Sequence, residues 1–250
     1  MLVRPFAFTV DDLTLPGEVV VPERPRALLV LCRGIPGSRV EDPTDGGYGG
    51  LARILAAEGY AASWFFFRGC YDAPGNFSAS GWCRDLEAAL DALAARPEVG
   101  SLPRILIGSS AGGGTAITVG ARRTDVHAVA TLAAVASWSF DGLAADRGEF
   151  LHRLRNAGLI RDPAFPPDQT AWAAEFDRES PDVHVASLAP RPLLLVHGDA
   201  DDVVPYPHAE RLFSLAHRPK ELVRIPGGAH QLRKDPRALE ALLDWLDRKA

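Results

Sequence analysis

Short, almost continuously apolar runs alternate with helix-length segments along most of the chain, and this alternation constrains the fold more than any other feature. From residue 26 onward the runs that we expect to be strands are 27–32, 61–67, 104–107, 128–132, 193–196 and 222–225. A strand that is apolar at almost every position is typical of a parallel sheet with helices on both faces. The alternation therefore predicts right-handed βαβ units and a doubly wound, mostly parallel α/β sheet.

The segments around these runs carry their own patterns. Residues 80–95 place Trp82, Leu86 and Leu90 on one face of an amphipathic helix, and a second such helix is expected near the C-terminus. At the N-terminus, residues 6–10 and 18–21 predict two short strands joined by a turn. Ligands of doubly wound sheets bind beyond the carboxyl ends of the strands, so we expect the functional residues in the loops that follow the strands.

One segment, 138–188, interrupts the alternation. It has no convincing strand, two helical stretches at 143–157 and 168–178, and six aromatic residues: Trp138, Phe140, Phe150, Phe165, Trp172 and Phe176. We expect a single domain over 1–250, with a core of 1–137 and 189–250 and with 138–188 inserted as a helical cap above the strand ends. These aromatics would attach the insertion to the core, line a pocket, or do both. Trp138, Phe140 and Phe150 are candidate substrate contacts.

Composition narrows the class of protein. The 250 residues are 47% hydrophobic and carry a net charge of −5 without a long basic run, which argues against nucleic acid or an anionic membrane as a partner. The three cysteines, Cys32, Cys70 and Cys83, form no CxxC pair and favour a reducing compartment. With no signal-peptide pattern and no long apolar stretch, we expect a cytoplasmic protein. The sequence leaves the oligomeric state open, and a homodimer is compatible with it.

The segment Gly108-Ser109-Ser110-Ala111-Gly112 follows an expected strand directly and precedes a helix-compatible run. It matches G-x-S-x-G centred on Ser110. A strand that turns sharply into a helix holds the serine backbone in a strained conformation, and small residues on either side let neighbouring backbones approach. Ser110 is therefore the candidate nucleophile. The alternative is a glycine-rich turn that only packs a helix on the sheet.

A nucleophilic serine needs a base, and His230 is the best placed of the seven histidines. It follows the last expected strand in a Gly-Gly-Ala loop that would let its imidazole reach over the sheet edge. We expect His197 to brace its own loop, and His208 and His217 to lie on a surface helix. Three more histidines precede the acid candidates in the chain: His127, His152 and His184.

The orienting acid is expected in the loop His197-Gly198-Asp199-Ala200-Asp201-Asp202. We favour Asp201, with Asp202 and then Asp199 as alternatives, and the resulting order Ser, Asp, His is the one expected for this fold. The same histidine and aspartates could also bind a metal. That hypothesis lacks a second, distant set of ligands and leaves the serine motif unexplained, so we expect neither a metal nor a cofactor.

Acyl transfer also needs two N–H donors for the developing oxyanion. The first is expected from Ala111, the residue after the candidate nucleophile. The second is expected from Ile35, in the loop Arg33-Gly34-Ile35-Pro36-Gly37-Ser38 after the first expected parallel strand. A simple turn is the alternative for this loop.

Together these motifs resemble the α/β-hydrolase superfamily over residues 17–248. In that resemblance the pattern H-G-x-x-D-x-x-V-P of 197–205 places the triad aspartate at Asp201. The loop 33–38 resembles H-G-x-x-G-S, with Arg33 where histidine is usual. Because the donor is a backbone N–H, activity should survive this change, and Arg33 is a candidate contact for an acidic group of the substrate.

The resemblance implies a serine hydrolase that needs no cofactor. Its expected reaction is cleavage of a small-molecule carboxylic ester through the triad Ser110, His230 and Asp201 and an acyl-enzyme. A peptidase or amidase of the same fold, acting on a short peptide, is the alternative, and a non-catalytic binding protein is a third possibility.

Overall fold

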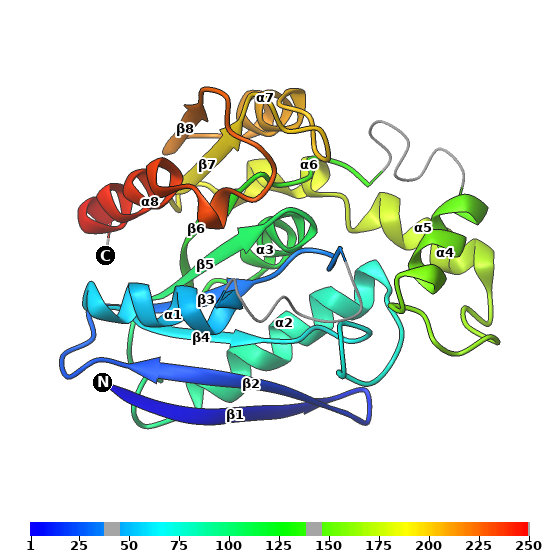
Figure 1. The fold of residues 1–250 in the computed structure, drawn as a ribbon, viewed down its shortest axis with the longest axis horizontal. Helices are drawn as coiled ribbons and strands as arrows, with labels where there is room; N and C mark the ends of the chain where they lie inside the picture. Colours follow the sequence, from blue (N-terminus) through cyan, green and yellow to red (C-terminus); the bar gives the residue numbers. More distant parts are fainter. Residues whose placement is uncertain (38–45, 139–146, 250) are drawn as a thin grey trace.

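The computed structural model describes residues 1–37, 46–138 and 147–249. In Figure 1 a twisted sheet lies between two layers of helices. The eight strands run in the order β1-β2-β4-β3-β5-β6-β7-β8. Their bounds are β1 (Leu2–Val10), β2 (Leu13–Val21), β3 (Leu28–Cys32), β4 (Ala61–Phe65), β5 (Arg104–Ser109), β6 (Val126–Leu132), β7 (Leu193–Gly198) and β8 (Lys220–Ile225). The expectation of a doubly wound, mostly parallel α/β sheet is confirmed.

In the sheet order β4-β3-β5-β6-β7-β8, neighbouring strands pair in parallel. At one edge β1 and β2 form an antiparallel hairpin, and β2 also pairs antiparallel with β4. Asp11 and Asp12 make the two-residue turn of this hairpin, with φ of 48° and 61°. Positive φ at both positions is the pattern of a type I′ turn, whose twist matches that of the flanking strands. The expected strand 61–67 ends at Phe65, two residues early.

Helices cover both faces of the sheet, and each face has its own apolar core. On one face lie α1 (Gly47–Ala57) and α8 (Pro236–Lys249), and the core on this face includes Trp245. On the other lie α2 (Ala79–Ala94), α3 (Ala111–Arg122) and α7 (Pro207–Leu215), and the core there includes Trp82. Burial on both faces explains why the parallel strands are apolar at nearly every position.

Between β6 and β7 the chain forms α4 (Arg147–Asn156), α5 (Gln169–Arg178), α6 (Pro181–His184) and the 3₁₀ turn η1 (Val185–Leu188). Figure 1 shows α4 and α5 on the side toward which the parallel strands point. Aromatic rings join these helices to the core. Phe77, from the loop before α2, lies with its ring centroid 6.1 Å from that of Phe176 and 6.2 Å from that of Phe150.

Glu179 ties this segment to α2 and α3 through both its side chain and its backbone. Its carboxylate accepts hydrogen bonds from Ser80 Oγ at 3.0 Å and from the Arg122 guanidinium. Its carbonyl oxygen accepts from Thr118 Oγ1 at 3.1 Å and from Trp138 Nε1 at 3.3 Å. Burial raises the pKa of Glu179, but the bonds from Arg122 and Ser80 outweigh it and the net pKa is lowered.

As expected, His208 lies on a helix at the surface, since one face of α7 is exposed, but its own side chain is buried. His208 lies on α7 but is only 1% exposed, and its Nδ1 accepts the backbone N–H of Ala136 at 2.9 Å. Ala136 follows the end of β6 and is buried, so its N–H needs an acceptor that the sheet no longer supplies. His217 is exposed but lies beyond the end of α7. No helix of the described residues is long and apolar enough to span a bilayer.

Candidate active site

Ser110 stands at the sharp junction between β5 and α3. Its backbone has φ 54° and ψ −126°, a strained conformation that costs about 1–3 kcal/mol and that the surrounding structure must enforce. Glycines on either side make this possible. A Cβ at Gly112 would overlap the carbonyl oxygen of Arg33, and a Cβ at Gly108 would lie 2.5 Å from the oxygen of Gly112. The small residues of the motif are therefore required by backbone contacts.

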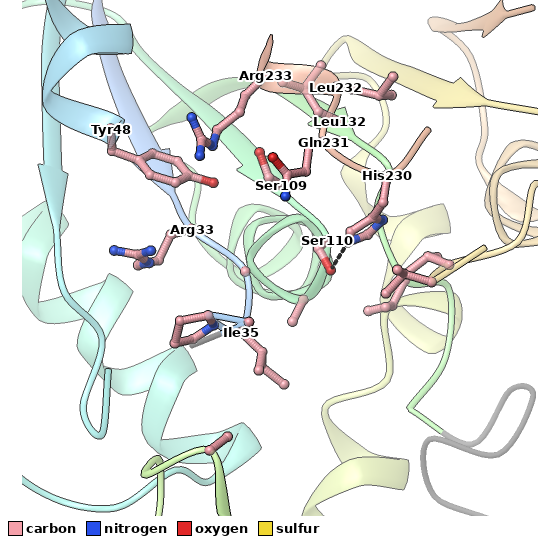
Figure 2. Close-up of a pocket in the computed structure, with 18 of the residues that line it drawn as sticks. Arg33, Ile35, Tyr48, Ser109, Ser110, Leu132, His230, Gln231, Leu232 and Arg233 are labelled. Carbon is pink, nitrogen blue, oxygen red and sulfur yellow. Dashed lines mark hydrogen bonds between the residues drawn. The ribbon is translucent and has the colours of Figure 1, made fainter. Parts of the chain in front are cut away.

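A chain of hydrogen bonds links Ser110, His230 and Asp201. His230 Nε2 lies 3.1 Å from Ser110 Oγ, and His230 Nδ1 lies 2.8 Å from Asp201 Oδ2 (Figure 2 shows the first of these contacts). Although Ser110 and His230 are 120 residues apart, both lie at the carboxyl end of the sheet. With Asp201 ionised, the Nδ1–H donates to the carboxylate, and Nε2 is free of its proton and accepts from the serine hydroxyl.

The Asp201 side chain is fully buried and well supplied with donors. Its second oxygen, Oδ1, accepts the N–H groups of Val203 at 2.9 Å and Val204 at 2.8 Å. Burial raises the pKa of Asp201, but the interactions with His197 and His230 and the N–H of Val204 outweigh it, so the net pKa is well below the ordinary range. The carboxylate thus stays ionised and holds the orientation of the His230 ring.

His197 braces the loop that carries Asp201. Its Nε2 lies 2.7 Å from the carbonyl oxygen of Val204 and 3.5 Å from Asp201 Oδ2. The two alternative aspartates lie elsewhere. Asp199 pairs with Arg224 at 2.7 Å and accepts the N–H of Gly227, while Asp202 is exposed. Of the three, it is Asp201 that contacts His230.

The two residues expected to donate to an oxyanion, Ile35 and Ala111, both line the space in front of Ser110. Ala111 is the first residue of α3, and first-turn N–H groups have no acceptor within their own helix. The loop of Ile35 is held tightly against the serine at Gly34. A Cβ at Gly34 would lie 2.8 Å from Ser110 Cβ.

A cavity of about 640 Å³ opens on Ser110 and His230. Of the expected substrate contacts, Arg33, Trp138 and Phe150 line it, and Phe140 lies outside the described residues. Sequence reasoning missed six polar lining residues: Tyr48, Tyr71, Arg153, Gln231, Arg233 and Lys234. Gln231 and Arg233 follow His230 so closely that their position could have indicated them, whereas Tyr48 comes from α1 and gave no signal. Among the described residues, no three His, Cys, Asp or Glu side chains are grouped as metal ligands.

A doubly wound sheet that presents a serine to a histidine at a strand-to-helix elbow defines an α/β hydrolase of the serine-hydrolase type. More narrowly, the chain belongs to the prolyl oligopeptidase family, whose sequence profile matches residues 79–250.

Known proteins resemble the chain in sequence or in fold. The Escherichia coli (strain K12) protein YfhR is 31% identical over 182 residues, which cover 72% of this chain and 56% of YfhR, so the chain spans about half of that relative. The esterase domain of a Rhodothermus marinus protein superposes with a TM-score of 0.72 at 23% identity over 99% of both chains. Pyrococcus horikoshii acylaminoacyl peptidase superposes with a TM-score of 0.73 at 18% identity, over 99% of this chain and 41% of that one. The two structures share the fold.

Proposed function

We propose that the protein hydrolyses carboxylic esters through a covalent acyl-enzyme, with Ser110 as nucleophile, His230 as general base and Asp201 as the orienting acid. The observation that carries the proposal is the continuous hydrogen-bonded path from Ser110 Oγ through His230 to Asp201, with the serine held in a strained backbone conformation. A packing turn would need neither the strain nor an imidazole at 3.1 Å from the hydroxyl.

In the first half-reaction, His230 Nε2 takes the proton of Ser110 as Oγ bonds to the ester carbonyl carbon. The N–H groups of Ile35 and Ala111 stabilise the oxyanion. His230 then gives its proton to the leaving alcohol as the ester bond breaks. In the second half, water loses a proton to His230, attacks the acyl-enzyme and releases the acid, and the proton returns to Ser110. The cycle consumes one water and needs no cofactor.

Residues 138–188 would form a cap over this site. Support comes from Trp138, Phe150 and Leu154, which line the cavity, and from Glu179, which binds the segment to α2 and α3. The cavity of about 640 Å³ is of the size that takes a small molecule. We therefore propose a small-molecule ester as the substrate.

A peptidase or amidase is the second candidate, because the matching family profile is that of the prolyl oligopeptidases and one superposed structure is an acylaminoacyl peptidase. We place the ester first because a cavity of about 640 Å³ is of the size that takes a small molecule.

The first experiment compares the wild type with Ser110→Ala on 4-nitrophenyl butyrate and on N-acetyl-alanine 4-nitroanilide. We expect the variant to lose ester turnover while its circular dichroism spectrum and melting temperature stay near those of the wild type. Anilide turnover should not exceed that of the variant, and strong anilide turnover would instead favour the amidase.

Labelling with a fluorophosphonate, followed by peptide mass spectrometry, locates the nucleophile directly. The adduct should be on Ser110 and not on its neighbour Ser109. Ser214→Ala, which changes an exposed serine of α7, is the matched control and should label like the wild type. Ester turnover that survives Ser110→Ala would rule out the proposed mechanism.

A further inference from the structure

We infer that Phe150 limits the length of the acyl chain that the site accepts, so that the preferred substrates are esters of acids whose apolar chain ends at its ring. The inference rests on the proposed function, because it specifies the substrate of the same site. It comes from the position of Phe150 between the cavity and a cluster of buried aromatic rings.

Phe150 belongs to two environments. It lines the cavity that opens on Ser110, yet it is only 3% exposed. Its ring centroid lies 5.5 Å from that of Phe176, 6.2 Å from that of Phe77 and 6.3 Å from that of Trp172. None of these three rings is among the described residues that line the cavity. Phe150 therefore separates the cavity from the aromatic cluster.

The cluster behind Phe150 is closely packed. Phe77, Trp172 and Phe176 are all buried, and the ring centroids of Trp172 and Phe176 are 4.7 Å apart. Trp172 Nε1 also donates a hydrogen bond to the carbonyl oxygen of Phe77 at 3.3 Å. Close-packed rings leave little room for Phe150 to swing away, so a chain that reaches its ring must either stop there or displace packed side chains.

Leu154 and Trp138 extend the wall that Phe150 begins. Leu154 lies four residues after Phe150 on α4, and therefore on the same face of the helix. Trp138 is fixed by the hydrogen bond from its Nε1 to the Glu179 carbonyl oxygen at 3.3 Å. Both residues line the cavity and are buried. An alkyl chain that covers this wall leaves water, and each methylene buried there should raise kcat/KM by at most about fourfold.

The position of His230 determines which half of the ester faces this wall. His230 must donate its proton to the leaving oxygen, so the alcohol half lies on the His230 side of Ser110. Figure 2 shows Ile35 on the opposite side of Ser110. Ile35 packs against the apolar core to which Phe150 belongs. The acyl chain therefore extends past Ile35 toward Phe150.

The alcohol half faces an open part of the cavity. Val203 lines the cavity and is 58% exposed, and its N–H donates to the carboxylate of Asp201, which contacts His230. The alcohol leaves first and can depart into solvent on this side. The acyl group stays at the closed end, between Ser110 and Phe150, until water attacks the acyl-enzyme.

The test measures kcat/KM for 4-nitrophenyl esters of the even-numbered straight-chain acids from acetate to dodecanoate. Each ester is kept below its critical micelle concentration, and the rate without enzyme is subtracted. For the wild type we expect kcat/KM to rise with chain length, to pass through a maximum and then to fall by about tenfold or more. Phe150→Ala should move the maximum to acids longer by about two to four carbons, because the phenyl ring it removes leaves room for roughly that many methylenes.

A second series varies the alcohol half, with acetates of straight-chain alcohols from ethyl to octyl followed by titration of the released acid. Its profile should be the same in the wild type and in Phe150→Ala. Phe6→Ala is the matched control, since it removes the same buried ring from β1, outside the lining of the cavity. This control should lose stability and keep the wild-type dependence on acyl chain length. If Phe150→Ala does not fold, Phe150→Leu carries the test and should move the maximum by about two carbons in the same direction.

The inference is overturned if kcat/KM of the wild type shows no maximum up to dodecanoate, if a folded Phe150 variant keeps the wild-type maximum, or if the shift occurs in the alcohol series. In those cases ester turnover still supports the proposed function. A wild type that hydrolyses none of the esters contradicts the proposed function as well.

Discussion

Replacement of Gly34 by alanine tests whether the close contact between its loop and Ser110 is needed for catalysis. The added Cβ would lie 2.8 Å from Ser110 Cβ, 3.0 Å from the Ser109 carbonyl oxygen and 3.3 Å from Ser110 Oγ. Ordinary contacts of a Cβ begin near 3.4 Å, so the serine or the loop must move by about 3.4 − 2.8 = 0.6 Å. The loop also carries Ile35, whose N–H we propose as an oxyanion donor.

A misplacement of 1 Å at a catalytic group costs roughly 10²-fold, so a shift of about 0.6 Å should lower kcat/KM by roughly tenfold or somewhat more. The loss should be mainly in kcat, because the shift disturbs the attacking oxygen more than the walls that bind the substrate. Steady-state hydrolysis of 4-nitrophenyl butyrate measures both constants, and a thermal melt shows whether the variant is folded.

Gly50→Ala is the matched control. A Cβ at this position meets no atom of the described residues within 4 Å, and Gly50 lies in α1, where alanine is favoured over glycine by about 0.5–1 kcal/mol. This variant should keep its activity and melt at or above the wild-type temperature. A folded Gly34→Ala enzyme within twofold of the wild-type kcat would refute the reasoning.

Two further predictions concern buried carboxylates. Asp201→Asn should lower kcat by about 10³-fold or more because the imidazole loses its orienting acceptor. The stability that Asp201 gives the wild type should also depend on pH, because the folded protein holds the pKa of this carboxylate below its ordinary value, so the carboxylate stabilises the fold above about pH 4 and loses this effect as the pH falls. In urea titrations, the difference in unfolding free energy between the wild type and Asp201→Asn should therefore be smaller at pH 3 than at pH 7. An unchanged difference contradicts this. Asp85→Ala removes the fully buried ion-pair partner of Arg68, whose Nη2 lies 2.6 Å from Asp85 Oδ1, and should lower the unfolding free energy by about 3 kcal/mol. Glu221→Ala removes one partner of the exposed ion pair with Arg248 and should lower it by under about 1 kcal/mol. Equal losses in the two variants would show that burial does not decide the strength of these pairs.

The sheet was predictable because burial on both faces leaves a direct mark on the sequence. Runs such as 27–32 and 193–196 correspond to β3 and β7, whose side chains are buried at every position. The end of β4 was less predictable, because Phe66 and Phe67 stay in aromatic clusters after the strand has ended at Phe65. The apolar side chains of Phe66 and Phe67 indicate that these residues pack against other rings, but they do not indicate where the hydrogen bonds between strands end.

The serine elbow was predictable for a different reason. The backbone contacts of Gly108 and Gly112 allow no Cβ, so a geometric requirement appears as fixed residue types at fixed spacing. Tyr48 and Arg233 have no comparable constraint. They come from α1 and from the turn after His230, and they meet beside Arg33 only through the packing of elements that are distant in sequence.

The positions of two polar side chains in the C-terminal half, Asp201 and His208, could not be predicted from the sequence pattern alone. In the loop 199–202, three aspartates have the same chemistry, and what distinguishes Asp201 is the pair of N–H groups from Val203 and Val204 that fixes its carboxylate. His208 was expected on a surface helix, yet its side chain is buried on the same face of α7 as Ala209 and Leu212, and Ala136 supplies the donor that makes its burial favourable. In both cases the position of the side chain depends on which backbone N–H groups the fold leaves in need of an acceptor. Polar residues that share a helix face with buried apolar ones should therefore be treated as candidate core acceptors.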